Sequence, residues 1–421
     1  MRSSHSRRLA VGAIATAGAV ALVLSGCSSS PSTSSSSGSK DLTLNIGTIL
    51  PQTGSLATLG PPAIEATNLA VDEINKADKG IKLTITQKDS GDTTTNIATQ
   101  SVTALLAQNV DAIIGAESSS VTLTVIKQIS GAKVLEFSPA NTSPDLSDEK
   151  LDNGYFWRDA PSDVLQGKVL GEKVAKDGHT NVSILYQNDS YGQGLNDNVK
   201  KSIESQGATV ATDVAFDPAA TDFSAEVNKV LAPKPDALVL ISFDQIKKIV
   251  PLLKTAGFDF KNLYGTDGNY GVIDPTTADV PSIEGAQFTN PGVQTSDDLK
   301  SKLQAQAKKD GAPELKAWSY APESYDAVTV LALAALKGGA TDGTTLKNNL
   351  RAVTHGSTDC KTFSACADAL KDGKSIHYQG QSGPISFQKN GDPGQAYISI
   401  YKYNADNSNT FESSQFGDLT K

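Results

Sequence analysis

The chain contains little cysteine and little histidine. Its 421 residues include three Cys and four His. No His lies in a His-Glu-x-x-His motif or beside a Gly-x-Ser-x-Gly motif, so the sequence offers few residues for a metallohydrolase or a His-based catalytic triad. A Gly-x-x-x-x-Gly-Lys-Ser/Thr phosphate loop is absent as well, which excludes a P-loop ATPase. We therefore expect a protein that is no enzyme and that uses neither a metal nor a cofactor.

Arginine is also rare, and the charge balance is acidic. Only five Arg occur, three of them within the first eight residues, so an Arg clamp for phosphate is not expected. Lys and Arg number 37 against 46 Asp and Glu, which gives a formal net charge of -9. Nucleic acids are bound by basic faces, so we expect no nucleic-acid partner. Apolar residues make up 38% and charged residues 20%, values typical of a folded chain.

Residues 1–26 have the layout of a secretory signal peptide. Three Arg precede an almost wholly apolar run from Leu9 to Leu24. A transmembrane anchor is the alternative, but the run is shorter than the roughly 20 residues that span a membrane. Residues 24–27, Leu-Ser-Gly-Cys, resemble the bacterial lipobox, which implies cleavage before Cys27 and lipid attachment to Cys27. The Ser-rich segment 27–40 predicts a flexible tether.

These features predict a protein held by lipid on the extracytoplasmic face of the bacterial cell membrane. Beyond Cys27 no run of 18 or more apolar residues occurs, so the body cannot form a pore by itself. Cys360 and Cys366, separated by five residues in an exported chain, suggest one disulfide. Zinc is a weaker alternative, because the spacing is not Cys-x-x-Cys and only His355 and His377 lie nearby.

Strand-like and helix-like segments alternate along the body. Such alternation predicts an α/β fold with parallel sheets covered by helices on both faces, and the series occurs twice, which predicts two lobes of one architecture. The first series has strands near 42–49, 82–88, 112–114 and 133–137, with helices near 63–76, 94–109 and 120–130. The second has strands near 182–186, 209–216, 237–243 and 262–265, with helices near 164–177, 194–206, 223–231 and 245–256. Further helices near 296–309, 319–336 and 344–353 and strands near 383–387 and 396–403 follow.

Short motifs at the ends of these strands resemble those of one family. They are Pro-Gln-Thr-Gly at 51–54, Gly-Ala-Glu-Ser-Ser-Ser at 115–120, Phe-Ser-Pro-Ala-Asn-Thr at 137–142, Asp-Ser-Tyr-Gly at 189–192, Gly-Pro-Ile-Ser-Phe at 383–387 and Asn-Gly-Asp at 390–392. Together they resemble the leucine/isoleucine/valine-binding proteins of bacterial ABC importers over roughly residues 41–405. The resemblance implies the type I periplasmic binding protein fold, in which two Rossmann-like lobes are joined by a three-crossover hinge and close around a ligand in the cleft between them. Independently, open parallel sheets bind ligands beyond the carboxyl ends of their strands.

The resemblance also divides the body between the two lobes. Residues 41–161 form the first part of lobe 1, and residues 162–288 form the first part of lobe 2. Residues 289–390, with the Cys360–Cys366 loop, return to lobe 1. Residues 391–421 supply the last strand of lobe 2 and a tail. Such repeated crossing between lobes makes a hinge.

The loops at the strand ends offer the groups that an α-amino acid requires. By resemblance, the carboxylate-binding Ser falls on Ser118, a backbone contact on Ala140 and a Thr on Thr142. Residues 118–120 open a helix, so backbone N–H groups and hydroxyls there can hold a carboxylate without Arg. Ordinary helix capping by these Ser is the alternative.

The remaining candidate residues lie in both lobes. Asp267 matches the acidic residue that binds the ammonium group, although the family position is more often Glu, and a solvated turn residue is the alternative. Tyr191 matches a Tyr of the cleft, or else covers the start of a helix. Phe243 stands where leucine-binding members carry Tyr, and Leu59 where they carry an aromatic residue.

We expect a monomeric receptor that captures a small amino acid, branched-chain or otherwise apolar, and delivers it to an ABC importer. The permease and ATPase subunits are then separate chains. Two alternatives stay open: the same fold binding short amides, urea or aromatic acids, and an extracellular ligand sensor.

Overall fold

A computed structural model describes residues 41–148 and 150–420. The predicted signal peptide, the tether and the lipidation site Cys27 lie outside the described residues. Lys40–Lys421 form one unit by their contacts, and the description below concerns this unit.

The first lobe is built on a five-stranded parallel sheet with the strand order β2-β1-β3-β4-β5. Neighbouring residues of a strand point to opposite faces, so Ile113 and Ile114 of β3 enter different cores, and both faces of the sheet are buried. The strands are β1 (Leu42–Leu50), β2 (Ile81–Asp89), β3 (Ala112–Gly115), β4 (Leu135–Ser138) and β5 (Phe156–Arg158).

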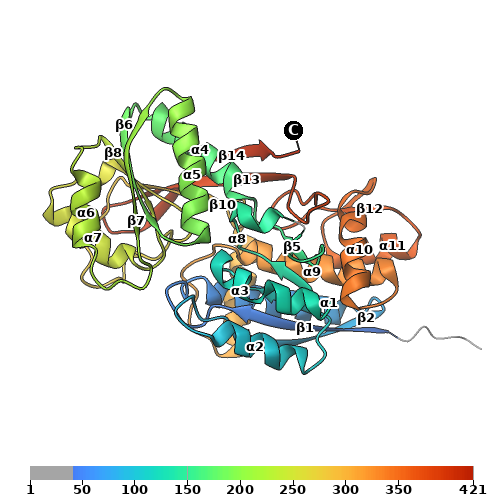
Figure 1. Cartoon of the computed structure of the whole chain (residues 1–421). Coiled ribbons are helices and arrows are strands. Elements are labelled where there is room, and N and C mark those ends of the chain that lie inside the picture. Colours follow the sequence, from blue (N-terminus) through green and yellow to red (C-terminus); the bar gives the residue numbers. More distant parts are fainter. Residues whose placement is uncertain (1–40, 149, 421) are drawn as a thin grey trace, which may run out of the picture. The chain divides into compact units, whose positions relative to one another are not determined.

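Helices cover both faces of this sheet (Figure 1). α2 (Ile97–Leu106) and α3 (Ser119–Gly131) pack on the face that carries Ile113. The other face is covered by segments that are far apart in the sequence, because α1 (Gly60–Ala77) packs there beside α9 (Ala321–Gly338). Three further helices surround this pair: α8 (Asp297–Asp310), α10 (Gly343–Thr354) and α11 (Phe363–Lys371).

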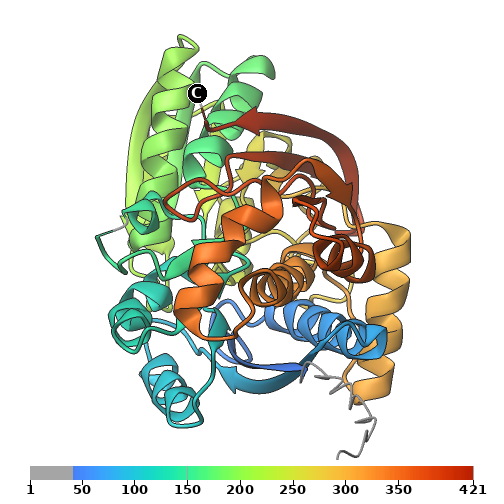
Figure 2. The same cartoon turned by 90° about the vertical axis from the view of Figure 1, so that its right-hand side faces the viewer.

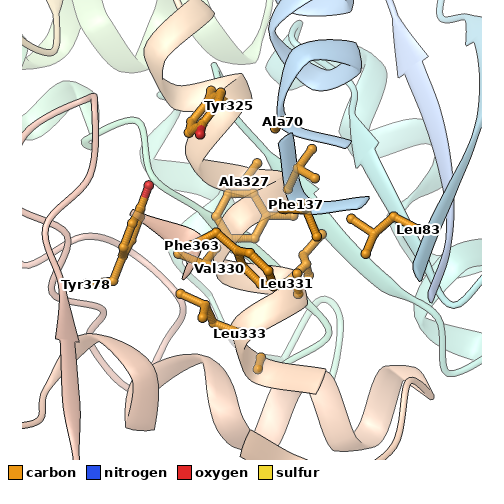
Figure 3. Packing of buried hydrophobic residues seen from close by; sticks show 14 of the residues in the cluster. Ala70, Leu83, Phe137, Tyr325, Ala327, Val330, Leu331, Leu333, Phe363 and Tyr378 are labelled. Carbon is orange, nitrogen blue, oxygen red and sulfur yellow. The ribbon is translucent and has the colours of Figure 1, made fainter. Parts of the chain in front are cut away.

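α9 lies at the centre of the larger core. All its residues from Ala321 to Ala335 are buried, which requires a helix that is mostly apolar on every side. Figure 3 shows Val330 and Leu331 of α9 gathered with Phe137 of β4. Asp326 is a buried acid of α9, and it accepts a hydrogen bond of 2.6 Å from the Tyr378 hydroxyl.

The second lobe is built on a seven-stranded sheet with the order β14-β13-β10-β9-β8-β6-β7. β6 to β10 are parallel, and β13 and β14 add two antiparallel strands at one edge. α4 (Asp163–Lys176) and α5 (Ser190–Ser205) cover one face, and α6 (Ser224–Leu231) and α7 (Ile246–Thr255) cover the other. The strands are β6 (Asn181–Gln187), β7 (Thr209–Phe216), β8 (Ala237–Ile241), β9 (Leu263–Gly265), β10 (Gln287–Pro291), β13 (Gln395–Tyr403) and β14 (Asn409–Asp418), with short 3-10 helices at Pro144–Ser147 and Phe260–Asn262.

The chain passes between the two lobes three times: between β5 and α4, between β10 and α8, and between β12 (Ile376–Tyr378) and β13. Figure 2 shows the orange helices of the return segment packed above the blue strands of the first lobe, with the red strands β13 and β14 in the other lobe. The predicted two-lobe α/β fold is confirmed. The lobe limits at residues 161, 288 and 390 stay a prediction, since strand pairing alone does not define where a lobe ends.

The strand expected near 383–387 is not formed. This segment makes only isolated bridges, Gln379 with Pro384 and Phe387 with Pro393. Pro384 has no N–H to donate to a ladder. Phe387 is held by side-chain packing instead, because its ring meets that of Trp157 edge-on at a centroid distance of 5.3 Å.

The residues expected to form a tail after 403 form a strand. β14 pairs antiparallel with β13 along its length and becomes the edge of the second sheet. Most of its side chains are exposed. The segment therefore lacks the apolar alternation that marks a half-buried strand.

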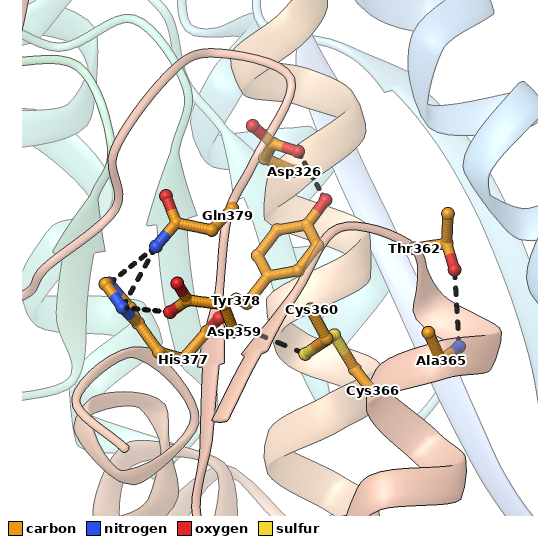
Figure 4. The surroundings of a disulfide bond; sticks show 9 residues. All are labelled: Asp326, Asp359, Cys360, Thr362, Ala365, Cys366, His377, Tyr378 and Gln379. Atoms are coloured by element: carbon orange, nitrogen blue, oxygen red, sulfur yellow. Dashed lines mark hydrogen bonds and ion pairs between the residues drawn. A yellow bond between two sulfur atoms is a disulfide. The ribbon is translucent and has the colours of Figure 1, made fainter. Parts of the chain in front are cut away.

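The predicted disulfide between Cys360 and Cys366 is present, with an S–S distance of 2.03 Å (Figure 4). It ties the end of β11 (Thr358–Cys360) to α11. β11 pairs in parallel with β12 (Ile376–Tyr378), and both short strands were absent from the expectation. Among the described residues, no helix is long and apolar enough to cross a membrane.

Candidate functional site

A small cavity lies where the loops after β3 and β4 of the first lobe meet those after β8 and β9 of the second. Its volume is about 10 Å³, which is room for about one water molecule. Side chains of both lobes therefore fill most of the space between these strand ends. The residues that line the cavity are Leu56, Leu59, Glu117, Ser119, Ala140, Thr142, Tyr191, Phe243, Asp267, Gly268 and Tyr320.

Six of the seven predicted ligand-binding residues meet at this cavity. They are Leu59, Ala140, Thr142, Tyr191, Phe243 and Asp267. Ser118 is buried beside the cavity's Glu117 and Ser119 in the sequence, but it does not line the cavity itself. These six residues were predicted from the positions of their motifs, and they come from four different loops and one helix. Their contacts with a ligand stay a prediction.

Asp267 is the polar centre of the site. Its carboxylate accepts hydrogen bonds from the Tyr191 hydroxyl at 2.8 Å, the Tyr320 hydroxyl at 2.6 Å and the Gln166 amide at 2.9 Å. Burial raises the pKa of Asp267, and the hydrogen bonds from Tyr320, Tyr191 and Gln166 oppose this rise. The three donors hold the carboxylate in one orientation and compensate part of the cost of its burial.

Tyr320 is a site residue that sequence reasoning missed. It precedes α9 with a φ of 60° in the left-handed region, so its backbone conformation is one that L-residues rarely adopt. The hydroxyl crosses from the first lobe to Asp267 in the second. Its position comes from the return of the chain to the first lobe, about 50 residues after Asp267, and no local motif marks it.

The start of α3 faces the second lobe. Ser118 is its N-cap residue, yet the Ser118 side chain makes no capping hydrogen bond, and its Oγ has no partner among the described residues. The Ser120 Oγ accepts a hydrogen bond of 3.1 Å from the Ser190 N–H at the start of α5. Backbone N–H groups at a helix start favour an anion. Gly115, at the end of β3, has a φ of 108°, and a Cβ there would lie 2.3 Å from the carbonyl oxygen of Ile49 in the neighbouring β1.

One wall of the cavity is apolar. Leu56 and Leu59 come from the loop after β1, and Ala140 comes from the loop after β4. On the other side, the rings of Tyr191 and Phe243 are stacked at a centroid distance of 5.4 Å. Leu56, in the turn before α1, is a further cavity residue that sequence reasoning missed.

A buried arginine supports the loop that carries Thr142. Arg158 is fully buried, and its guanidinium donates to Asp392 at 2.6 Å, to the carbonyl of Asn141 at 3.1 Å and to the carbonyl of Ser143 at 2.9 Å. Burial raises the pKa of Asp392, but the charge of Arg158 and its hydrogen bond outweigh this and hold that pKa below its usual value. Arg158 thus joins the first and third passages between the lobes.

The fold and the cleft define a two-lobed ligand-binding protein, whose site is made by loops of both lobes. Sequence comparison matches residues 43–404 to the family described as periplasmic binding protein. The chain therefore belongs to the periplasmic binding protein family. This is a family of solute-binding proteins, in agreement with the expectation that the chain is no enzyme.

Relatives and solved structures agree with this assignment. Leu/Ile/Val-binding protein homolog 3 of Brucella melitensis is 27% identical over 368 residues, which cover 86% of this chain and 91% of the relative. The leucine binding protein LivK of Thermotoga maritima has a similar structure, with a TM-score of 0.71, 22% identity, and coverage of 88% of this chain and 98% of that one. A solute binding protein of an ABC transporter from Rhodopseudomonas palustris, in complex with 3,4-dihydroxybenzoic acid, gives a TM-score of 0.69 at 19% identity, covering 90% and 98%. The resemblance to leucine/isoleucine/valine-binding proteins is confirmed.

Proposed function

We propose that this protein captures a small α-amino acid between its two lobes and delivers it to an ABC importer made of separate chains. The observation that carries the proposal is the buried carboxylate of Asp267, held in the cleft by hydroxyls from both lobes. An ammonium group is the ligand group that best balances such a charge in a site without a protein cation. Family membership and the Leu/Ile/Val-binding relative support an amino acid as the source of that group.

The rest of the amino acid finds complementary groups around Asp267. The N-terminus of α3, with the hydroxyls of Ser118 and Ser119, suits the carboxylate, because N–H groups and the helix dipole favour an anion. Ala140 and Thr142 lie on the neighbouring loop and suit contacts to the same group. The apolar wall with Leu59 and Phe243 suits the methyl and methylene groups of a short side chain, which the branched-chain amino acids present.

Hinge motion accounts for capture and release. The cavity of about 10 Å³ is too small for an amino acid, so the lobes must separate for entry. Hydrogen bonds that join the lobes, such as Tyr320 to Asp267 and Ser190 to Ser120, favour the closed form. A ligand that contacts both lobes adds to this preference by its differential affinity for the closed form. Closure then presents a surface that a permease can distinguish from the open form.

Location and assembly complete the proposal. Family membership supports an extracytoplasmic location. We propose in addition that lipid on Cys27 anchors the protein to the membrane, and that it works as a monomer beside its permease. An extracellular sensor is the alternative function: it would close around its ligand in the same way but would bind a receptor instead of a permease. The Rhodopseudomonas palustris protein of similar structure binds an aromatic acid, so an aromatic acid is the alternative ligand and is included in the binding panel.

The test is a binding panel on the purified protein, after unfolding and refolding to remove carried-over ligand. Amino acids, short amides, urea and aromatic acids are compared by thermal shift and calorimetry. Asp267→Ala should weaken amino-acid binding by roughly 2–5 kcal/mol, about thirtyfold or more, because it leaves a buried ammonium unpaired. Asp274→Asn is the matched control, since Asp274 lies on the same segment but does not line the cavity.

Amino-acid affinity that is unchanged in Asp267→Ala would reject the assignment of the ammonium site. A response confined to aromatic acids or amides would replace the amino acid as the ligand and leave the fold assignment intact.

A further inference from the structure

Glu117 is a buried acid in the cleft that the site described so far does not use. It lies between β3 and the N-cap residue of α3, is 3% exposed and lines the cavity. Neither of its carboxyl oxygens has a hydrogen-bond partner among the described residues. Burial raises the pKa of Glu117 to about 8. A carboxyl group left without a partner is destabilising in either protonation state, so its presence at this position calls for a reason.

The groups around the cavity do not supply a partner. Of the residues that line it, only Glu117 and Asp267 carry charged side chains. Asp267 has its own three donors, from Tyr191, Tyr320 and Gln166. Lys and Arg are absent from the lining, and the buried Arg158 is engaged by Asp392 and the loop carbonyls. Glu117 is therefore a hydrogen-bonding group in the cavity for which the described residues supply no partner.

Glu117 and Asp267 reach the cavity from different lobes. Asp267 provides the acidic partner of the ammonium in the second lobe, whereas Glu117 belongs to the first lobe and shares the cavity with the apolar Leu56 and Leu59. A ligand with a purely aliphatic side chain would leave both oxygens of Glu117 unsatisfied. A hydroxyl or amide on a short side chain would satisfy one of them and keep the apolar contacts.

We propose that Glu117 accepts a hydrogen bond from the side chain of the bound amino acid, so that the cleft prefers amino acids with a side-chain donor over apolar ones of the same shape. The inference rests on the proposed function and names its substrate class. Thr and Val are nearly isosteric, as are Asn and Leu. The two pairs therefore separate the effect of a donor from the effect of size.

The experiment measures dissociation constants of L-Thr, L-Val, L-Asn and L-Leu by calorimetry on the refolded wild-type protein. At least one donor-bearing member should bind about tenfold or more tightly than its apolar isostere, because a site built for a hydrogen bond discriminates against an analogue that lacks it. Glu117→Met keeps the length of the side chain without its acceptor and should abolish or reverse this preference. Glu117→Gln keeps one acceptor oxygen and should retain part of it.

Glu136→Met is the matched control. Glu136 of β4 is another buried acid whose carboxyl oxygens have no partner among the described residues, but it does not line the cavity. Its replacement should leave the ranking of the four ligands unchanged. Thermal unfolding of every variant checks that it folds, and the wild-type ranking tests the proposal even if Glu117→Met does not fold.

The outcomes separate this proposal from the proposed function. Binding of Val or Leu as tight as that of their donor-bearing partners, with a ranking that Glu117→Met does not change, would overturn the role of Glu117 and leave amino-acid capture standing. An absence of binding by every amino acid in the panel would overturn amino-acid capture itself, and the role of Glu117 with it.

Discussion

Replacement of Arg158 is the sharpest test of how the cleft loops are supported. Arg158→Met removes a guanidinium that is fully buried and leaves Asp392, whose side chain is 7% exposed, without its cationic partner. It also removes the donors to the Asn141 and Ser143 carbonyls on either side of Thr142. We expect the variant to be less stable and to bind ligand more weakly.

The size of the effect follows from the burial of the pair. Breaking a buried ion pair by removing one partner costs about 3–5 kcal/mol, because the remaining charge is uncompensated. The described body has roughly 380 residues, and an unfolding entropy of about 2.1 cal/mol/K per residue then converts this cost to a fall in Tm of about 4–6 °C. Asp392→Asn combined with Arg158→Met should recover part of the loss, since the orphaned charge is then gone.

The assay is calorimetric unfolding of ligand-free protein at pH 7, with Arg351→Met as the matched control. Arg351 is only partly buried and donates one hydrogen bond, to the Phe387 carbonyl, so its loss should cost about 1 kcal/mol. An equal, small fall in Tm for both Arg variants, or full additivity in the Arg158 and Asp392 double variant, would refute the reasoning.

Acidification provides a second readout of the same variant. In the wild type, Arg158 holds the pKa of Asp392 below its usual value, so the pair's contribution is present above about pH 4 and is lost as the pH falls through the lower folded pKa. In Arg158→Met the Asp392 carboxylate is buried without a cation, and its protonation at low pH removes the cost of that unpaired charge. The Tm difference between the two proteins should therefore shrink from pH 7 to pH 4, and a constant difference would contradict the electrostatic explanation.

Two further predictions concern the cysteines. Replacing both Cys360 and Cys366 by Ser should lower the free energy of unfolding by about 2.4 kcal/mol, the chain-entropy value for a loop of about seven residues. Ligand affinity should stay unchanged, because the loop is not part of the cavity. Denaturant unfolding measures the first effect, and calorimetric binding measures the second. Cys27→Ser should move the protein from the membrane fraction to the soluble fraction of the expressing cells, and retention in the membrane would contradict the lipid anchor.

Local patterns in the sequence determined the class of the fold. Strand and helix periods alternate with short turns, and this alternation has few solutions other than parallel sheets with helices on both faces. Strands without that pattern could not be found in this way. β14 carries mostly exposed side chains at the edge of its sheet, and its strand conformation depends on pairing with β13. The segment at 383–387 has apolar residues, but Pro384 and the packing of Phe387 on Trp157 prevent a ladder.

The residues of the candidate site also fall into those that the sequence could predict and those that it could not. Leu59, Ala140, Thr142, Tyr191, Phe243 and Asp267 follow strands of the predicted sheets, so strand order and motif position suffice to bring them to one cleft. Tyr320 has no such marker, because its place beside Asp267 depends on α9 returning to the first lobe and packing on α1.

Glu117 shows most clearly what the sequence decides and what the tertiary structure decides. The sequence by itself determined that an acid stands between β3 and α3, in a motif at a ligand-binding strand end. Only the tertiary structure decided that this acid is buried in the cavity, that no cation lines it and that Asp267 already has its own donors. The physical reason is that the partners of a buried charge come from segments distant in sequence, and their presence or absence depends on how the lobes pack.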